Sequence, residues 1–93
     1  METIKEIKKI RSERVEQLKE TIGEYNPEAL FADGHDHAIM GYSSDGRVVY
    51  SADQIIGGLM NAGMTNEEAV EYFHFNIAGA YVGEFTPIYM YEE

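Results

Sequence analysis

Apolar residues recur at helical spacing in the first part of the chain. The stripe consists of Ile4, Ile7, Val15, Leu18 and Ile22, with Arg11 in place of an apolar residue in one turn. This spacing predicts one amphipathic helix over residues 2–22, ended by Gly23. The stripe is narrow, as in a helix-pairing seam. It predicts either edge-on packing against the rest of the chain or oligomerisation through these five apolar residues.

A β-hairpin is predicted in the middle of the chain. Residues 37–42 and 47–50 have strand-like composition, and the four residues between them end in Asp45-Gly46, a strong signal for a tight turn. The C-terminal segment 85–91 alternates and is aromatic, and Pro87 near its start favours an edge strand. We expect this third strand to join the hairpin in a three-stranded antiparallel sheet.

Two further helices are predicted, each beginning with a capping-box pattern. Ser51 is followed three residues later by Gln54, and Thr65 by Glu68. The pattern predicts helices over about 52–61 and 66–82, with small residues at 57–58 and 78–80 that favour close helix–helix contact. The fold class is therefore α+β: a long N-terminal helix over residues 1–24, then a small domain over residues 25–93 in which two helices pack on the sheet.

Length and composition restrict the class of protein. A chain of 93 residues without cysteine is long enough for one modest core and has no disulfide or zinc ribbon. No apolar run approaches the roughly 20 residues of a membrane span, and the N-terminus lacks the apolar core of a signal peptide. We expect an intracellular protein without a membrane partner.

Negative charge dominates after the first helix. The formal net charge is −10, and residues 23–93 contain twelve acids against the single base Arg47. Such a field repels nucleic acid and speeds encounter with a basic protein surface; the alternative is that it maintains solubility. The candidate partner-binding acids are Asp33, Asp36, Asp45, Glu67, Glu68, Glu71 and Glu84.

The histidine-containing segment 33–37 is a candidate metal site. In a strand, His35 and His37 would point to the same side, with Asp33 as the nearest third ligand. The alternative, which we favour, is a polar turn that leads into the hairpin, so no metal or other cofactor is expected. No nucleophile constellation accompanies these residues, and we expect no catalytic activity.

Aromatic residues near the C-terminus have two interpretations. Tyr81, Phe85, Tyr89 and Tyr91 either pack in the core or form an exposed interface patch.

Part of the sequence resembles a known group of proteins. The segment from Glu71 to Ile88 reads EYFHFNIAGAYVGEFTPI, and shorter stretches around Asn26-Pro27, Val48–Ser51 and Gly63–Ala69 add to it. These segments are similar to small acidic, uncharacterised proteins of tailed bacteriophages and prophages. The resemblance covers about two thirds of the chain and implies a phage accessory protein of the bacterial host cytoplasm, without catalytic residues.

Three functions remain open at this point. The first is a non-enzymatic inhibitor whose acidic surface mimics nucleic acid and binds a basic surface of a bacterial protein, such as a defence (CRISPR-type) nuclease. The second is a self-assembling accessory protein that uses the N-terminal helix. The third is a small-molecule or metal-binding protein that uses His35 and His37.

Overall fold

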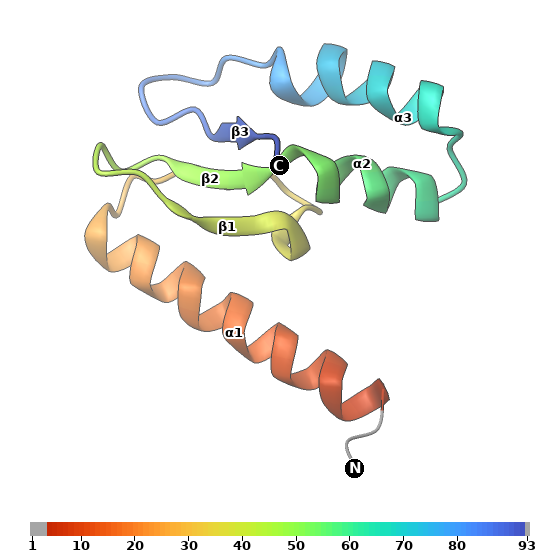
Figure 1. Cartoon of the computed structure of the whole chain (residues 1–93). Coiled ribbons are helices and arrows are strands. Elements are labelled where there is room, and N and C mark those ends of the chain that lie inside the picture. The colour runs from red at the N-terminus through yellow and green to blue at the C-terminus, as the bar shows by residue number, and fades with distance from the viewer. Residues whose placement is uncertain (1–3, 93) are drawn as a thin grey trace.

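The computed structural model describes residues 4–92, with side-chain surroundings from Ser12 onward. It is an α+β fold of three helices and a three-stranded mixed sheet (Figure 1). The elements in chain order are α1 (Ile4–Tyr25), a short 3-10 helix η1 (Asp36–Ala38), β1 (Ile39–Tyr42), β2 (Val48–Ser51), α2 (Ala52–Asn61), α3 (Asn66–Tyr72), a π-helical segment η2 (Phe73–Ala78) and β3 (Ile88–Met90).

The predicted hairpin is confirmed. β1 and β2 pair antiparallel, and the Ser43 N–H donates to the Arg47 carbonyl at 2.8 Å. Gly46 has a φ of +85°, and a Cβ there would lie 2.6 Å from Asn26 Nδ2, so both the turn and a close side-chain approach favour glycine. The first strand begins at Ile39 and not at His37, because residues 36–38 form η1.

The prediction that all three strands are antiparallel is wrong. β3 joins β2 as expected but runs parallel to it, with Val49 opposite Ile88 and Tyr50 opposite Tyr89. Parallel neighbours need a long crossover, and α2, α3 and η2 provide it by returning the chain to the end where β2 begins. Just before the two strands, Arg47 Nε donates to the Thr86 carbonyl at 2.6 Å, which joins their starting points.

The two predicted helix caps form to different extents. Thr65 and Glu68 make the complete reciprocal capping box of α3. At α2, the Ser51 hydroxyl accepts from the Gln54 N–H at 3.1 Å, but the Gln54 side chain contacts Glu92 at 3.4 Å. Ser51 is therefore a simple N-cap.

The first and last helices differ from their predicted bounds. α1 continues through Gly23 to Tyr25. The α-helical part of the last helix ends at Tyr72, where it changes to the π-helical segment η2, and the helical chain stops at Ala78. The predicted continuation to residue 82 is wrong, because Gly79 closes the segment.

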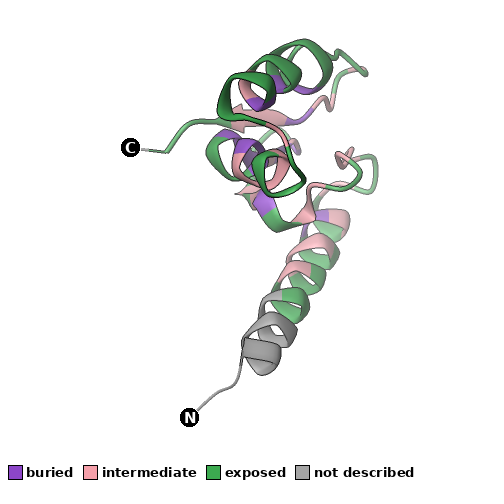
Figure 2. Cartoon of the chain, turned by 90° about the vertical axis from the view of Figure 1, so that its right-hand side faces the viewer, coloured by how far each residue is buried: buried purple, intermediate pink, exposed green. Residues whose placement is uncertain are grey.

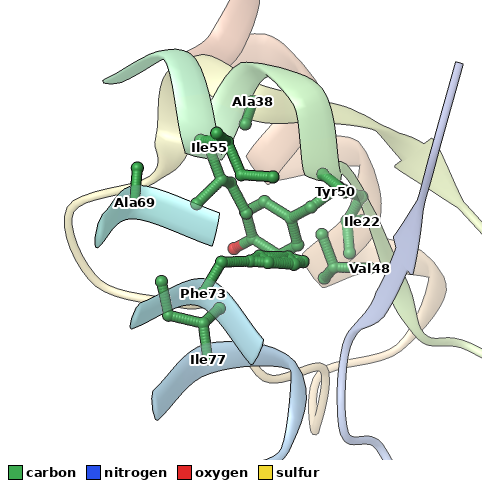
Figure 3. Packing of buried hydrophobic residues seen from close by; sticks show 10 residues of the cluster. Ile22, Ala38, Val48, Tyr50, Ile55, Ala69, Phe73 and Ile77 are labelled. Carbon is green, nitrogen blue, oxygen red and sulfur yellow. The ribbon is translucent and has the colours of Figure 1, made fainter. Parts of the chain in front are cut away.

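The core lies between the sheet and the three helices. Tyr50 of β2 and Phe73 of η2 are its largest fully buried side chains, and Figure 3 shows them against Ile55 and Ile77. Tyr89 of β3 stacks on Tyr50, with centroids 5.7 Å apart, and meets Phe73 edge-on at 5.5 Å. These aromatic contacts attach the C-terminal strand to the helical layer.

The end of α1 belongs to this core. Ile22 is fully buried, and Leu18 packs against the same cluster. The Tyr25 ring lies at a tilt against Tyr42 of β1, with ring centroids 4.8 Å apart. Ile22 therefore stabilises the fold of its own chain and is not on an outer face. Among the residues that the structure describes, no helix is both long and apolar enough to cross a membrane.

Candidate protein-binding surface

The segment from α3 to η2 separates a core-facing row from an outward row. Ala69, Phe73 and Ile77 follow one another at intervals of four and are all buried. Apart from Val70, which packs against the core, the residues between them are exposed: Phe75 is 77% exposed, and Tyr72 is 42% exposed. Figure 2 shows the same division, with buried positions on the inner side of this helical layer and exposed positions on its outer side.

Gly79 permits the π-helical turn. Its N–H donates to the His74 carbonyl, five residues earlier, at 3.1 Å. A Cβ at this position would lie 2.9 Å from that same carbonyl oxygen, so a larger residue would push against backbone. Gly58, in contrast, makes room for the His37 ring, whose Nε2 would lie 2.8 Å from a Cβ. These two contacts, and not helix–helix approach, account for glycine at both positions.

The loop after η2 is held in place by hydrogen bonds. The Thr86 hydroxyl donates to the Gly83 carbonyl at 2.6 Å and accepts from the Val82 N–H at 3.0 Å. Gly83 has a φ of +121°, and Pro87 is buried. This anchored loop leaves Tyr81 80% exposed and Val82 59% exposed.

A shallow hollow opens on the outer side of α3 and η2. It measures about 330 Å³ and is lined by Met64, Glu68, Glu71, Tyr72, Phe75 and Asn76. Three of these side chains are apolar or aromatic, and two are carboxylates. We call it the aromatic hollow.

Acidic residues line the aromatic hollow and also lie elsewhere on α3 and in the loop that follows η2. Glu67, Glu68 and Glu71 are exposed on α3, and Glu84 is exposed in the following loop. Glu68 also has a structural role, because its carboxylate accepts from the Thr65 N–H at 3.0 Å. Hydrogen bonds from the Thr65 backbone and side chain lower the pKa of Glu68, which favours its charged form.

The other three predicted acids lie elsewhere. Asp36 pairs with Lys19 at 3.0 Å, beside α1. Asp45 accepts a hydrogen bond from Ser43 in the hairpin turn, and Asp33 is in the turn before η1. Figures 1 and 2 agree in placing α1 and α3 on opposite sides of the molecule. The seven predicted acids therefore do not form one surface, and only the group from Glu67 to Glu84 lies on or after α3.

The basic side chains of Lys19 and Arg47 make contacts within the chain. The hydrogen bond to Asp36 raises the pKa of Lys19, whose ammonium also lies 5.2 Å from the centre of the Phe31 ring. Arg47 donates to the Thr86 carbonyl. These contacts leave the carboxylates around the aromatic hollow without either base as a partner.

The two histidines have structural surroundings. His37 Nε2 lies 3.1 Å from the Gln54 carbonyl, and the His35 and His37 rings are 6.4 Å apart. Partial burial, and secondarily the neighbouring His37, lower the pKa of His35. Among the side chains that the structure describes, residues 12–92, no group of three or more acidic or histidine residues is arranged to hold a metal ion.

The predicted oligomerisation residues fall into three groups. Ile22 is in the core, and the side chains of Ile4 and Ile7 lie outside the described part of the chain. Val15 and Leu18 line an open groove of about 1100 Å³ between α1 and the first strand, together with His37, Met40 and Gln54. This groove is the second candidate surface.

Of the predicted aromatic patch, the structure exposes Tyr81 and Tyr91, whereas Tyr89 is half-buried in aromatic contacts. Sequence reasoning missed Phe75 and Val82. For Phe75, the two-residue spacing from Phe73 was the available signal, because it puts the two rings on opposite sides of a helix. No protein-family model, curated protein or solved structure was found to match this chain.

Proposed function

We propose that this chain is a non-catalytic binding protein that blocks a basic surface of a bacterial protein with its own acidic surface. The proposal rests on one observation above all: exposed carboxylates gather on α3, while Lys19 and Arg47 make internal contacts. Acidic surfaces of this kind attract the Lys- and Arg-lined channels that bind nucleic acid. A bacterial nuclease of a defence system is the candidate target.

The phage resemblance supports this proposal. The similar segment, Glu71 to Ile88, includes the outward residues of η2 and the loop that follows. Small acidic phage accessory proteins that act in the host cytoplasm fit a role as an inhibitor of host defence. In this reading the chain contacts no nucleic acid and needs no cofactor.

A salt series with charge-reversed variants tests the proposal. Tagged protein is incubated with bacterial lysate, washed at rising salt, and the retained proteins are identified by mass spectrometry. We expect a single basic, nucleic-acid-binding protein that is lost above roughly 0.3 M salt, because exposed charges are screened within a few ångströms there. Retention that does not change with salt concentration would contradict the proposal.

Matched variants locate the binding surface. Glu67→Lys with Glu71→Lys reverses two charges on α3, and Glu24→Lys with Glu28→Lys makes the same change in net charge near the end of α1. We expect the first pair to abolish retention and the second to weaken it slightly. Equal losses in both pairs would mean that net charge, and not this surface, controls binding.

Self-association is a second candidate function. It is favoured by the groove between α1 and the first strand, whose lining includes the apolar Val15 and Leu18. Val15→Asp should convert an oligomer to a monomer in sedimentation experiments if this groove is used. A monomeric parent protein at millimolar concentration would exclude this function.

A further inference from the structure

The surface around the aromatic hollow contains more apolar area than a mimic of nucleic acid requires. Phosphate mimicry needs carboxylates at the surface, but Phe75 in the hollow is 77% exposed, and Tyr81 in the loop after η2 is 80% exposed. Exposed rings of this size are enriched among the residues that dominate binding energy at protein interfaces. An occupant that offered charge alone would leave both rings in water.

The fold holds these rings outward at fixed positions. Phe75 lies between the buried residues Phe73 and Ile77, so rotation of the segment about its axis would expose the core. Tyr81 and Val82 belong to the loop that Thr86 closes through its hydroxyl. Pre-organised side chains lose little conformational freedom on binding, which favours their use as anchors.

We infer that the aromatic hollow binds an amphipathic basic helix of the partner protein. The inference rests on the proposed function and names the partner chemistry of the same surface. An apolar side chain of that helix enters the hollow and contacts Phe75 and Tyr72. Lysine or arginine side chains on either side of it meet Glu67 and Glu71.

Charge complementarity decides between this occupant and others. Apolar lining with carboxylates at the rim excludes an acidic helix, and it gives a wholly apolar helix no partner for the carboxylates. An amphipathic helix offers apolar residues at intervals of three or four with basic residues beside them, which matches a groove-binding mode. A second copy of this chain is the competing occupant and is an outcome of the test below.

Two synthetic helical peptides of equal length and charge test the inference. One has leucine at intervals of three or four and lysine at the positions between, so that one face of the helix is apolar, and the other has serine in place of every leucine. In isothermal titration at 0.15 M salt, we expect the Leu–Lys peptide to bind at least about tenfold more tightly than the Ser–Lys peptide, as burial of a large apolar side chain implies. Equal affinity of the two peptides would overturn the inference.

Exposed-residue variants assign the effect to this surface. Phe75→Ser should lower the affinity for the Leu–Lys peptide about tenfold and leave the affinity for the Ser–Lys peptide unchanged. Met90→Ser is the matched control and should change the affinity of neither peptide. Met90 is an apolar residue of β3, and its side chain is as exposed as that of Tyr72. Unchanged Leu–Lys affinity of Phe75→Ser would overturn the inference, provided that the melting temperature shows a folded variant.

The same titrations separate the two proposals. If both peptides bind equally and both lose affinity in the Glu67→Lys, Glu71→Lys variant, the acidic surface acts by charge alone and only the aromatic inference fails. If neither peptide responds to this variant, the proposed function fails as well. Sedimentation of the free protein gives the remaining outcome: a dimer that Phe75→Ser dissociates would overturn the inference in favour of a second copy.

Discussion

Phe73 and Phe75 lie two residues apart in one π-helical segment, yet one is 1% exposed and the other 77% exposed. Phe73 contacts Tyr89 inside the fold, whereas Phe75 lines the aromatic hollow. The inner ring is explained by stability, since its burial removes a large apolar area from water. The outer ring has no such explanation within the chain, which is why we assign it to a partner.

The largest expected effect comes from truncation of the inner ring. Phe73→Ala should lower the free energy of unfolding by about 3–5 kcal/mol, because it removes buried area and leaves a cavity. Phe75→Ala should change it by less than about 0.5 kcal/mol. Urea titrations of the two variants measure this contrast, and equal destabilisation would contradict the division of the segment into two sides.

Gly79 sharpens the comparison, because it ends the π-helical segment that contains both rings. Gly79→Ala should lower the free energy of unfolding by about 1–3 kcal/mol, since the added Cβ would lie 2.9 Å from the His74 carbonyl oxygen. Gly57→Ala is the control: it meets open space in α2 and should raise stability by up to about 1 kcal/mol. Thermal unfolding compares them, and a stabilising Gly79→Ala would show that the π-helical turn is not constrained as described.

Alkaline pH should lower the free energy of unfolding through ionisation of the buried Tyr50. Burial raises the pKa of Tyr50 to about 12, and its hydroxyl oxygen accepts from the Ala32 N–H at 2.7 Å. Because the folded pKa is above the unfolded value near 10, this stability is complete below pH 10 and is lost as the pH rises toward 12, by about 2 kcal/mol. Chemical unfolding at pH 9, 10 and 11 measures the loss, and Tyr50→Phe should show a shallower dependence. An identical pH profile in that variant would refute the assignment.

The smallest effect concerns the start of α3. Thr65→Ala removes the hydroxyl that accepts from the Glu68 N–H at 3.2 Å and should lower the free energy of unfolding by about 1 kcal/mol. Glu67→Ala lies in the same turn without a cap contact and should have an effect of a few tenths of a kcal/mol. Circular dichroism melts of both variants test whether the Thr65–Glu68 cap stabilises α3 while the neighbouring Glu67 does not.

The sequence predicted the local elements of this fold better than their assembly. Asp45-Gly46 marked the hairpin, and Thr65 with Glu68 marked the start of α3, because turn and cap chemistry depend on neighbouring residues. The direction of β3 depends on how two helices return the chain, which no local pattern encodes. The parallel pairing with β2 was therefore missed.

The candidate surface was predicted in part. The acids of α3 were named from composition, and Tyr81 was left with two interpretations, but Phe75 was missed. Its spacing was the available signal, since residues two apart on a helix are about 200° apart, which puts Phe75 opposite the buried Phe73. Asp36 and Asp45 illustrate the opposite error, because charge alone did not reveal their contacts with Lys19 and Ser43.

Amide hydrogen exchange of the protein, free and with the Leu–Lys peptide, tests the central claim most directly. We predict slower exchange across α3, η2 and the loop to Glu84 when the peptide is bound, with α1 and the first strand unchanged. Protection confined to α1 and β1, around the groove that Val15 and Leu18 line, would contradict the account and place the binding surface on the opposite side of the molecule.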